Sequence, residues 1–479
     1  MNSAHPQSHR TLLTALFTAA LLAIAQPGAA QPAGGGADMP TPATAGGAAG
    51  GEIGFGQIDE DFFVNLELHF TFGLPVPKLG CAPDEDDCLT RLRFGILAPL
   101  RLRVIDREPK QDSILREEDW SEFSDYLRII RFIEYGFPHE PLYVRLGELG
   151  PAVLGHGTIV NGYYNVITTD HYQLGSQLNV NTVYGGVETL INNLAGPHVL
   201  GMRLYVRPWA FIDRESWWNR LAVGTSIVSD IDAPLDLGRD TDGSISVGAH
   251  QRPQVTRSQA TTLAGLDVEL NLVRTSMFSV TPYSDLNHHF GIGPGWHNGV
   301  LTQFWPTESL GLFARLEHRT LSGKYLPDYI GPLYEIDRFQ FPGWSEGLPA
   351  PKLRVAATRE DGLVQGVFGS ATANVFGLIS AGLAYEDYQG PNNSSLRLRL
   401  SLTPTQAMQL GVFYFKGNFD SFDEIFELDK AMLVTEARVP ISGPLYLKAQ
   451  YSRLWRLEDD GRYTTVNDWN VGVGVSFAL

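Results

Sequence analysis

Apolar and polar residues alternate one by one over several stretches of this chain. In residues 65–72, leucine and phenylalanine occupy every second position, and Asn, Glu, His and Thr occupy the positions between them. Residues 202–207, 266–272 and 396–402 repeat this pattern. Successive side chains of a β-strand point to opposite faces of a sheet, so each stretch predicts a strand with one apolar and one polar face.

Weaker copies of this pattern run from residue 92 to residue 451. With the glycine-rich stretches near 367–385, they predict about 16 strands, in a range of about 14 to 18, each of about 9 to 11 residues. The expected fold is all-β, a closed antiparallel transmembrane β-barrel. Closure is expected because an open strand edge in hydrocarbon leaves N–H and C=O groups unpaired.

A soluble antiparallel sandwich alternates in the same way, but two further features favour the membrane barrel. Charged residues recur inside the strands on the polar face, where a water-filled lumen accommodates them; examples are Glu67, Arg101, Asp267 and Arg397. Aromatic residues gather near strand ends, as membrane-interface residues do; examples are Phe62, Trp209, Trp218 and Trp305.

The C-terminal segment gives the most specific pattern. From Trp469 to Leu479, apolar residues occupy every second position, and the residues between them are Asn, Gly, Ser and Ala. Here the chain resembles the outer-membrane β-barrel proteins of Gram-negative bacteria, over about residues 60 to 479, with no subfamily indicated. In that family a last strand of this kind is recognised by the barrel-assembly machinery; it usually ends in an aromatic residue, whereas this chain ends in Leu479 with Phe477 two positions earlier.

The N-terminal region predicts export and a three-part organisation. Residues 1–30 form a signal peptide with an apolar run from Leu12 to Ala25, too short for a spanning helix. Residues 31–54 are rich in Ala, Gly and Pro and predict a flexible periplasmic leader. Residues 55–479 are the predicted barrel, located in the bacterial outer membrane.

The net charge and the two cysteines limit the kinds of partner that the protein is expected to bind. A net charge of −17 argues against nucleic acid, because phosphate binding rewards Lys and Arg. The expected partners are outer-membrane lipid and small hydrophilic solutes, with a homo-oligomer as an open alternative and no cofactor. Cys81 and Cys88 flank an acidic run, and a disulfide between them fits an oxidising compartment, with a cation site as the alternative.

The candidate residues for a selective lumen are charged positions on the polar strand face. Many of them are arginines, which favour anionic permeants if they share one wall. They are Arg91, Arg93, Arg101, Arg103, Arg145, Arg203, Arg207, Glu317 and Arg319.

Two further clusters lie outside the simple strand pattern. His288, His289 and His297 offer imidazoles to a transition metal, but their spacing does not make the rings converge, so no metal site is expected. His156, between two glycines in the segment 150–165, is either a ligand or catalytic base, or part of a turn or an inward-folded loop.

The leading expectation is therefore a porin-like channel for passive diffusion, not an enzyme. Three alternatives stay open. The first is a ligand-specific or plugged barrel transporter, which a lumen filled by residues 150–165 would favour. The second is an outer-membrane enzyme, although no nucleophile elbow or paired-carboxylate motif is present. The third is a structural or adhesive barrel.

Overall fold

The computed structural model describes most of the chain from residue 48 to residue 478. The residues outside the description are 1–47, 59–60, 80–87, 108–112, 117–118, 121–122, 139, 167–171, 242, 249–251, 308, 343–349, 405–407, 430, 459 and 479. The predicted signal peptide, most of the predicted leader and Cys81 fall in these ranges, so the export signal and the disulfide stay predictions.

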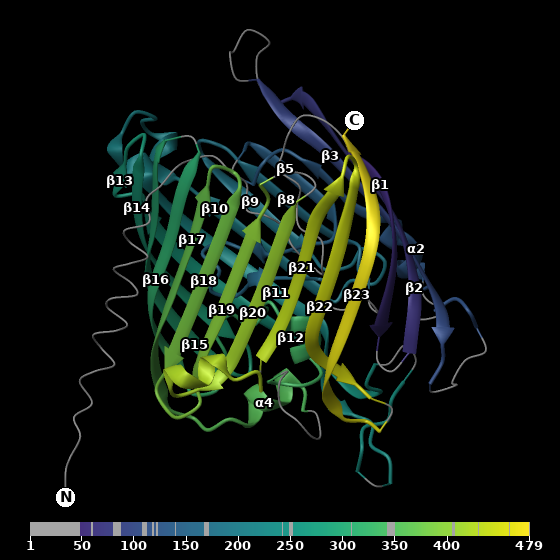
Figure 1. Ribbon diagram of the computed structural model, residues 1–479. Helices are drawn as coiled ribbons and strands as arrows, with labels where there is room; N and C mark the ends of the chain where they lie inside the picture. The colour runs from purple at the N-terminus through teal and green to yellow at the C-terminus, as the bar shows by residue number, and fades with distance from the viewer. Residues whose placement is uncertain are drawn as a thin grey trace, which may run out of the picture.

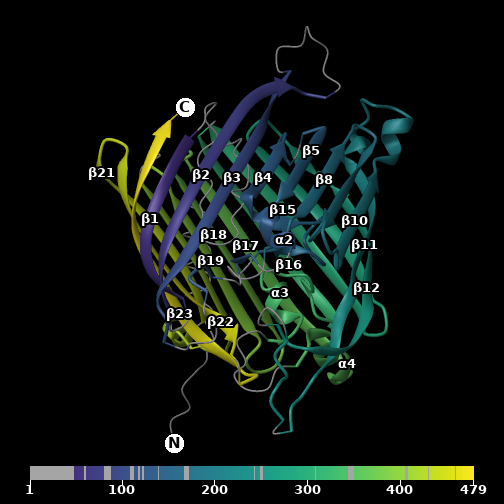
Figure 2. The same cartoon turned by 90° about the vertical axis from the view of Figure 1, so that its right-hand side faces the viewer.

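One sheet forms the wall (Figures 1 and 2). Its first strands are β1 (Ala48–Ile58), β2 (Asp61–Pro77), β3 (Leu89–Ile105), β4 (Ile130–Tyr135), β5 (Leu142–Gly147), β8 (Gly175–Asn181), β9 (Gly185–Ile191), β10 (Val199–Val206), β11 (Leu221–Leu237) and β12 (Val255–Leu270). The others are β13 (Val273–Arg274), β14 (Phe278–His289), β15 (Gly293–Thr307), β16 (Leu310–Ser322), β17 (Leu363–Val375), β18 (Ile379–Tyr388), β19 (Ser394–Leu402), β20 (Gln409–Phe419), β21 (Ala431–Ser442), β22 (Leu445–Leu457) and β23 (Tyr463–Ala478).

The short elements lie between these strands. They are the hairpin strands β6 (Ala152–Val153) and β7 (Asn161–Tyr163), and the helices α2 (Phe123–Tyr126), η2 (Leu127–Ile129), η3 (Pro208–Phe211), η4 (Trp217–Arg220), α3 (Tyr334–Asp337), α4 (Lys352–Thr358) and η6 (Phe422–Phe426). Within the described residues, no helix is long and apolar enough to cross a bilayer.

The sheet closes on itself through its first and last strands. Strand β1 pairs antiparallel with β2 on one side and with β23 on the other, where Ala48 lies opposite Ala478. Because β1 begins at Ala48, it includes the last residues of the stretch predicted as a leader. The predicted closed antiparallel all-β barrel is therefore confirmed.

The predicted strand number is wrong. The sheet has 21 strands, and because β12 and β13 both pair with β14, the wall is 20 strands around instead of about 16. Strand β4 spans only 6 residues and strands β8 and β9 only 7, too short for a clear alternation. Strand β14 was missed for another reason, because Ser284 and His288 place polar residues on its outward face as well.

In the wall strands, apolar side chains are exposed and charged side chains are buried, the reverse of the arrangement in a soluble protein. On β12, the outward Leu266 and Val268 are 63% and 41% exposed, whereas Asp267 between them is 4% exposed. The same contrast separates the outward Leu286 from the inward Asp285 on β14. An apolar outer wall around a polar interior is the arrangement of a transmembrane β-barrel.

Connection lengths orient the barrel. At the edge that carries the C-terminus, strands join through short turns such as 376–378 and 443–444. The opposite edge carries the long connections 106–129, 148–174, 238–254 and 323–362. Since such barrels have short periplasmic turns and long extracellular loops, we assign the C-terminal edge to the periplasm.

A truncation tests closure by β1. Deleting residues 48–54 removes most of the partner of β23 and leaves two strand edges unpaired in hydrocarbon, which costs several kcal/mol for each unsatisfied group. We expect the variant to lose the heat-modifiable gel mobility of a folded barrel. A matched deletion of residues 34–40 should keep it; equal mobility of both variants would contradict the role of β1.

Candidate functional site in the lumen

Two long connections fold into the barrel and meet there. They are the inward loop, residues 148–174 between β5 and β8, and the helical loop, residues 323–362 between β16 and β17. Val160 and Ile330 form a parallel β-bridge between them, and both side chains are completely buried. The stretch 150–165 is thus an inward-folded loop that fills part of the lumen.

A hydrophobic core surrounds this contact. Inward side chains of five wall strands and buried side chains of both loops form one cluster. Its members include Leu190, Val199, Val228, Leu263 and Leu321 from the wall, and Leu154, Tyr163, Tyr325, Tyr329 and Tyr334 from the loops. Burial of this much apolar surface keeps the two loops inside the barrel.

Glu335 of α3 links the helical loop to the inward loop and to the connection between β9 and β10. Its carboxylate accepts hydrogen bonds from Tyr163 at 2.5 Å and Gln173 at 2.9 Å, and it lies 3.2 Å from His198. Burial alone would raise the pKa of Glu335, but His198, Arg338 and Tyr163 outweigh burial and lower it to about 2. The carboxylate is therefore charged at every physiological pH.

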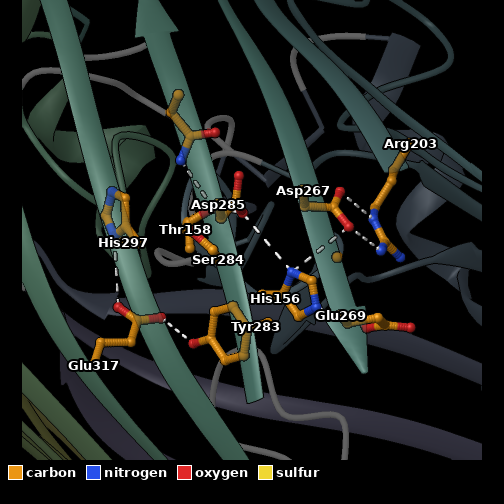
Figure 3. Close-up of polar contacts among 12 residues, drawn as sticks. His156, Thr158, Arg203, Asp267, Glu269, Tyr283, Ser284, Asp285, His297 and Glu317 are labelled. Carbon is orange, nitrogen blue, oxygen red and sulfur yellow. Dashed lines mark hydrogen bonds and ion pairs between the residues drawn. The ribbon is translucent and has the colours of Figure 1, made fainter. Parts of the chain in front are cut away.

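The tip of the inward loop presses His156 against the wall (Figure 3). Gly155 and Gly157 on either side have positive φ angles and leave no room for a Cβ beside Arg203 and Arg315. The Gly155 N–H donates to Glu188 over 2.7 Å, and Arg315 donates to the His156 carbonyl oxygen. Glycines at these positions let the backbone approach the wall closely.

The His156 ring lies among acidic and aromatic side chains. Its Nε2 atom is 2.7 Å from Glu269, its Nδ1 atom is 3.9 Å from Asp285 and 4.0 Å from Asp267, and the ring stacks on Tyr283 at 4.1 Å (Figure 3). Burial alone would lower the pKa of His156, but the nearby carboxylates of Asp285 and Glu269 outweigh burial and raise it to about 9. A protonated His156 thus neutralises part of an acidic wall.

Arg203 and Glu317, two of the predicted lumen residues, flank this contact. Arg203 donates to both oxygens of Asp267, over 2.6 and 3.0 Å, and pairs with Glu188 at 3.0 Å. Glu317 pairs with Arg319 at 2.6 Å and also accepts a hydrogen bond from Tyr283. These charges pair with one another across the strands of the wall.

Arg319 links the wall to the helical loop, and Arg207 lies at the periplasmic rim. Arg319 is completely buried and pairs with Asp328 at 3.1 Å and Glu386 at 3.2 Å. Arg207 follows the end of β10 and donates to the carbonyl oxygen of Thr182 over 2.5 Å. Of the predicted arginines, Arg207 is therefore a rim residue.

Arginines of β3 and β5 converge on a single carboxylate near the periplasmic edge. Arg91 and Arg145 each lie 2.6 Å from Glu134 of β4, and Arg93 lies 3.6 Å from it. We call these three arginines and Glu134 the arginine cluster. Three guanidinium groups around one carboxylate leave an excess of positive charge, and each arginine side chain keeps 9% to 14% of its surface exposed.

Arg101 and Arg103 lie farther along β3, towards the extracellular edge. Arg101 lies 2.6 Å from the completely buried Asp119, and Arg103 lies 3.0 Å from Asp61. The alternation of β3 placed its arginines on the inward face, but neither Glu134, the partner of Arg91, nor Asp119, the partner of Arg101, was predicted. In the sequence Glu134 lies among apolar residues and Asp119 ends an acidic run, and neither context specifies a pairing.

The three candidate histidines are not brought together. His289 and His297 point inward and are completely buried, whereas His288 lies on the exposed outer face, because it neighbours His289 in the same strand. His289 contacts Thr261 at 2.6 Å and His297 lies 3.5 Å from Glu317. No group of three or more His, Cys, Asp or Glu side chains suited to a metal ion occurs in the described part of the chain.

A third connection crosses the extracellular mouth. Residues 238–254, the mouth segment, leave the wall at β11 and β12 and reach the turn between β22 and β23, which lies half-way around the barrel. Ile245 is 1% exposed, and its backbone lies so close to Gly461 that a Cβ on Gly461 would overlap it. Val247 packs against the hydrophobic cluster that contains Trp455, Leu457 and Tyr463.

The raised pKa of His156 gives a pH prediction. The stabilisation from protonated His156 is fully present below its ordinary pKa of 6.5 and is lost as pH rises through about 9. Hydrogen exchange of residues 152–165 should therefore accelerate between these values. In His156→Gln, exchange of these residues should rise with pH only as fast as the intrinsic exchange rate does. If the variant showed the same pH dependence as the parent protein, His156 would be ruled out as the source of the acceleration.

The docking of the mouth segment gives a second prediction. Ile245→Ser places a hydroxyl in an apolar site and Gly461→Ala forces a side chain against the segment, so both should loosen it. Each variant should admit solutes into proteoliposomes faster than the parent, while Thr241→Ala, at an exposed position of the same segment, should not. Equal rates in all four proteins would show that the segment does not limit entry.

No protein-family model matches the chain, and no curated protein matches its sequence. The solved structures similar to it include Acinetobacter baumannii OccAB3, with 10% identity, coverage of 90% of this chain and 98% of that chain, and a TM-score of 0.33. For Pseudomonas aeruginosa OccK11 (OpdR) these values are 10%, 91%, 95% and 0.34.

A mutant of the ferric enterobactin receptor PfeA of Pseudomonas aeruginosa has 9% identity, covers 91% of this chain and 81% of that chain, and gives a TM-score of 0.33. Likenesses this distant carry no argument about function. The closed wall, with its apolar exterior and charged interior, confirms the expected outer-membrane β-barrel.

Proposed function

We propose that this protein is a selective outer-membrane channel for small anionic solutes, narrowed by two inward-folded loops. The observation that carries the proposal is the arginine cluster, in which three arginines share Glu134. An unbalanced positive patch on an inner wall attracts anions and repels cations. Because the arginine cluster lies near the periplasmic edge, an anion moving inward would meet it at the end of its passage through the barrel.

The two loops favour a selective channel over a general porin. Their core occupies part of the lumen, and the mouth segment covers the extracellular end. A solute that enters must pass between packed loops and a charged wall, where size and charge both matter. This supports the ligand-specific or plugged barrel among the alternatives that the sequence left open.

Transport is also better supported than catalysis. The contact closest to a nucleophile and base pair is Thr261 with His289, 2.6 Å apart. The Nδ1 atom of His289 has no hydrogen-bond partner among the described residues, so no carboxylate there orients the ring. A triad needs such an orienting group.

Conductance and charge selectivity test the proposal. Arg93→Gln leaves Glu134 paired with two arginines, so the fold should persist while one unit of positive charge is lost. A unit charge about 8 Å from a permeant in water acts with roughly 0.5 kcal/mol. Its removal should lower anion permeability and raise cation permeability about twofold each, so the anion-to-cation permeability ratio in planar bilayers should fall about fivefold.

The matched control is Arg453→Gln, which removes the same charge from the outer wall, where Arg453 lies opposite Leu433 and Asn467. Its selectivity should equal that of the parent. Absence of any conductance in the parent would refute the channel. Equal shifts in both variants would refute the role of the arginine cluster.

A further inference from the structure

One connection at the periplasmic edge is larger than its geometry requires. Strands β21 and β22 join through residues 443–444, whereas β10 and β11 join through residues 207–220, which we call the aromatic turn. It contains η3 and η4, which project outward from the wall at the upper left of Figure 1. Closing a hairpin needs only a few residues, so the extra length calls for another role.

The aromatic turn is ordered by its own contacts. Trp209 stacks on Trp218 at 5.7 Å, and Trp217 meets Trp218 edge-on at 5.0 Å. The Trp218 backbone N–H donates to the Ser216 hydroxyl over 3.3 Å, and the Asn219 side chain donates to the Asp213 carbonyl oxygen over 2.7 Å. These contacts hold the aromatic turn in a defined conformation, and we call its apolar face the platform.

Its apolar side chains are left uncovered. Ile212 is 81% exposed, Phe211 67%, Trp218 49% and Trp217 43%. Clustered exposure of large apolar groups marks a surface that something else covers. Charged residues of the same turn, Asp213, Arg214, Glu215 and Arg220, give it a polar side as well.

The apolar platform continues the outer wall. Val206 and Val223 face each other at the ends of β10 and β11, point outward and are 49% and 42% exposed, as lipid-facing residues are. The turn on one side exposes Val183 (62%) and the connection on the other exposes Met277 (49%). The platform therefore begins where the lipid-covered wall ends.

From this continuity we propose that the aromatic turn docks on the inner leaflet of the outer membrane and anchors the barrel at the phospholipid headgroup boundary. Tryptophan and phenylalanine side chains favour this boundary, where rings contact acyl chains and polar groups remain hydrated. Arg214, whose guanidinium lies 5.0 Å from the Tyr184 ring, adds a positive charge beside lipid phosphates. The proposal is independent of what passes through the lumen.

Site-directed spin labelling in phospholipid vesicles tests the docking. In a Cys81→Ser/Cys88→Ser background of the full chain, a label at Ile212→Cys should collide often with oxygen and rarely with an aqueous nickel chelate. A label at Glu215→Cys, a matched exposed position of the same turn, should show the reverse. Adding Phe211→Ser and Trp217→Ser should move the Ile212→Cys label towards the aqueous pattern.

Two results would overturn the proposal. Equal access of the nickel chelate to both labels would place the turn in water. Shelter of the Ile212→Cys label from both reagents in vesicles of purified protein would show that protein covers the platform, either another part of the barrel or a second copy. Heat-modifiable gel mobility of each variant confirms that the barrel itself is folded.

Discussion

The rest of the structure depends on one constraint, which is that no backbone N–H or C=O group can stay unpaired in hydrocarbon. This constraint forces the sheet to close, and closure joins β1 to β23, which lie at opposite ends of the chain. It also fixes which face of each strand meets lipid, because a closed wall has only an outside and an inside. The exposed Leu266 and the buried Asp267 on β12 are consequences of the same closure.

Closure creates a second requirement inside the barrel. The loops that fill the lumen must leave no buried charge uncompensated, because an unpaired charge away from water is costly. Partners therefore come from different segments: His156 meets Glu269, Glu335 meets Tyr163 and His198, and Arg319 meets Asp328. The arginine cluster departs from this balance, since three arginines share Glu134, which is why it is the best candidate for contact with a permeant.

The two ends of the barrel differ for a physical reason. At the extracellular end, the mouth segment buries Ile245 and packs the partly buried Val247 against the far wall, so the protein itself covers these apolar groups. At the periplasmic end, the aromatic turn keeps Phe211 and Ile212 exposed beside the lipid-facing wall. Large apolar side chains thus pack against the protein at the extracellular end and face away from it at the periplasmic end.

The sequence alone determined the all-β barrel, the inward face of β3 with its arginines and the terminal strand, because strand alternation is a local property that each segment carries by itself. It did not determine the number of strands, since short strands such as β4 and β8 show little alternation. It also could not find Glu134 as the partner of Arg91, or decide that residues 150–165 fill the lumen. Those facts depend on contacts between distant segments, such as Val160 with Ile330, and only the tertiary structure brings those segments together.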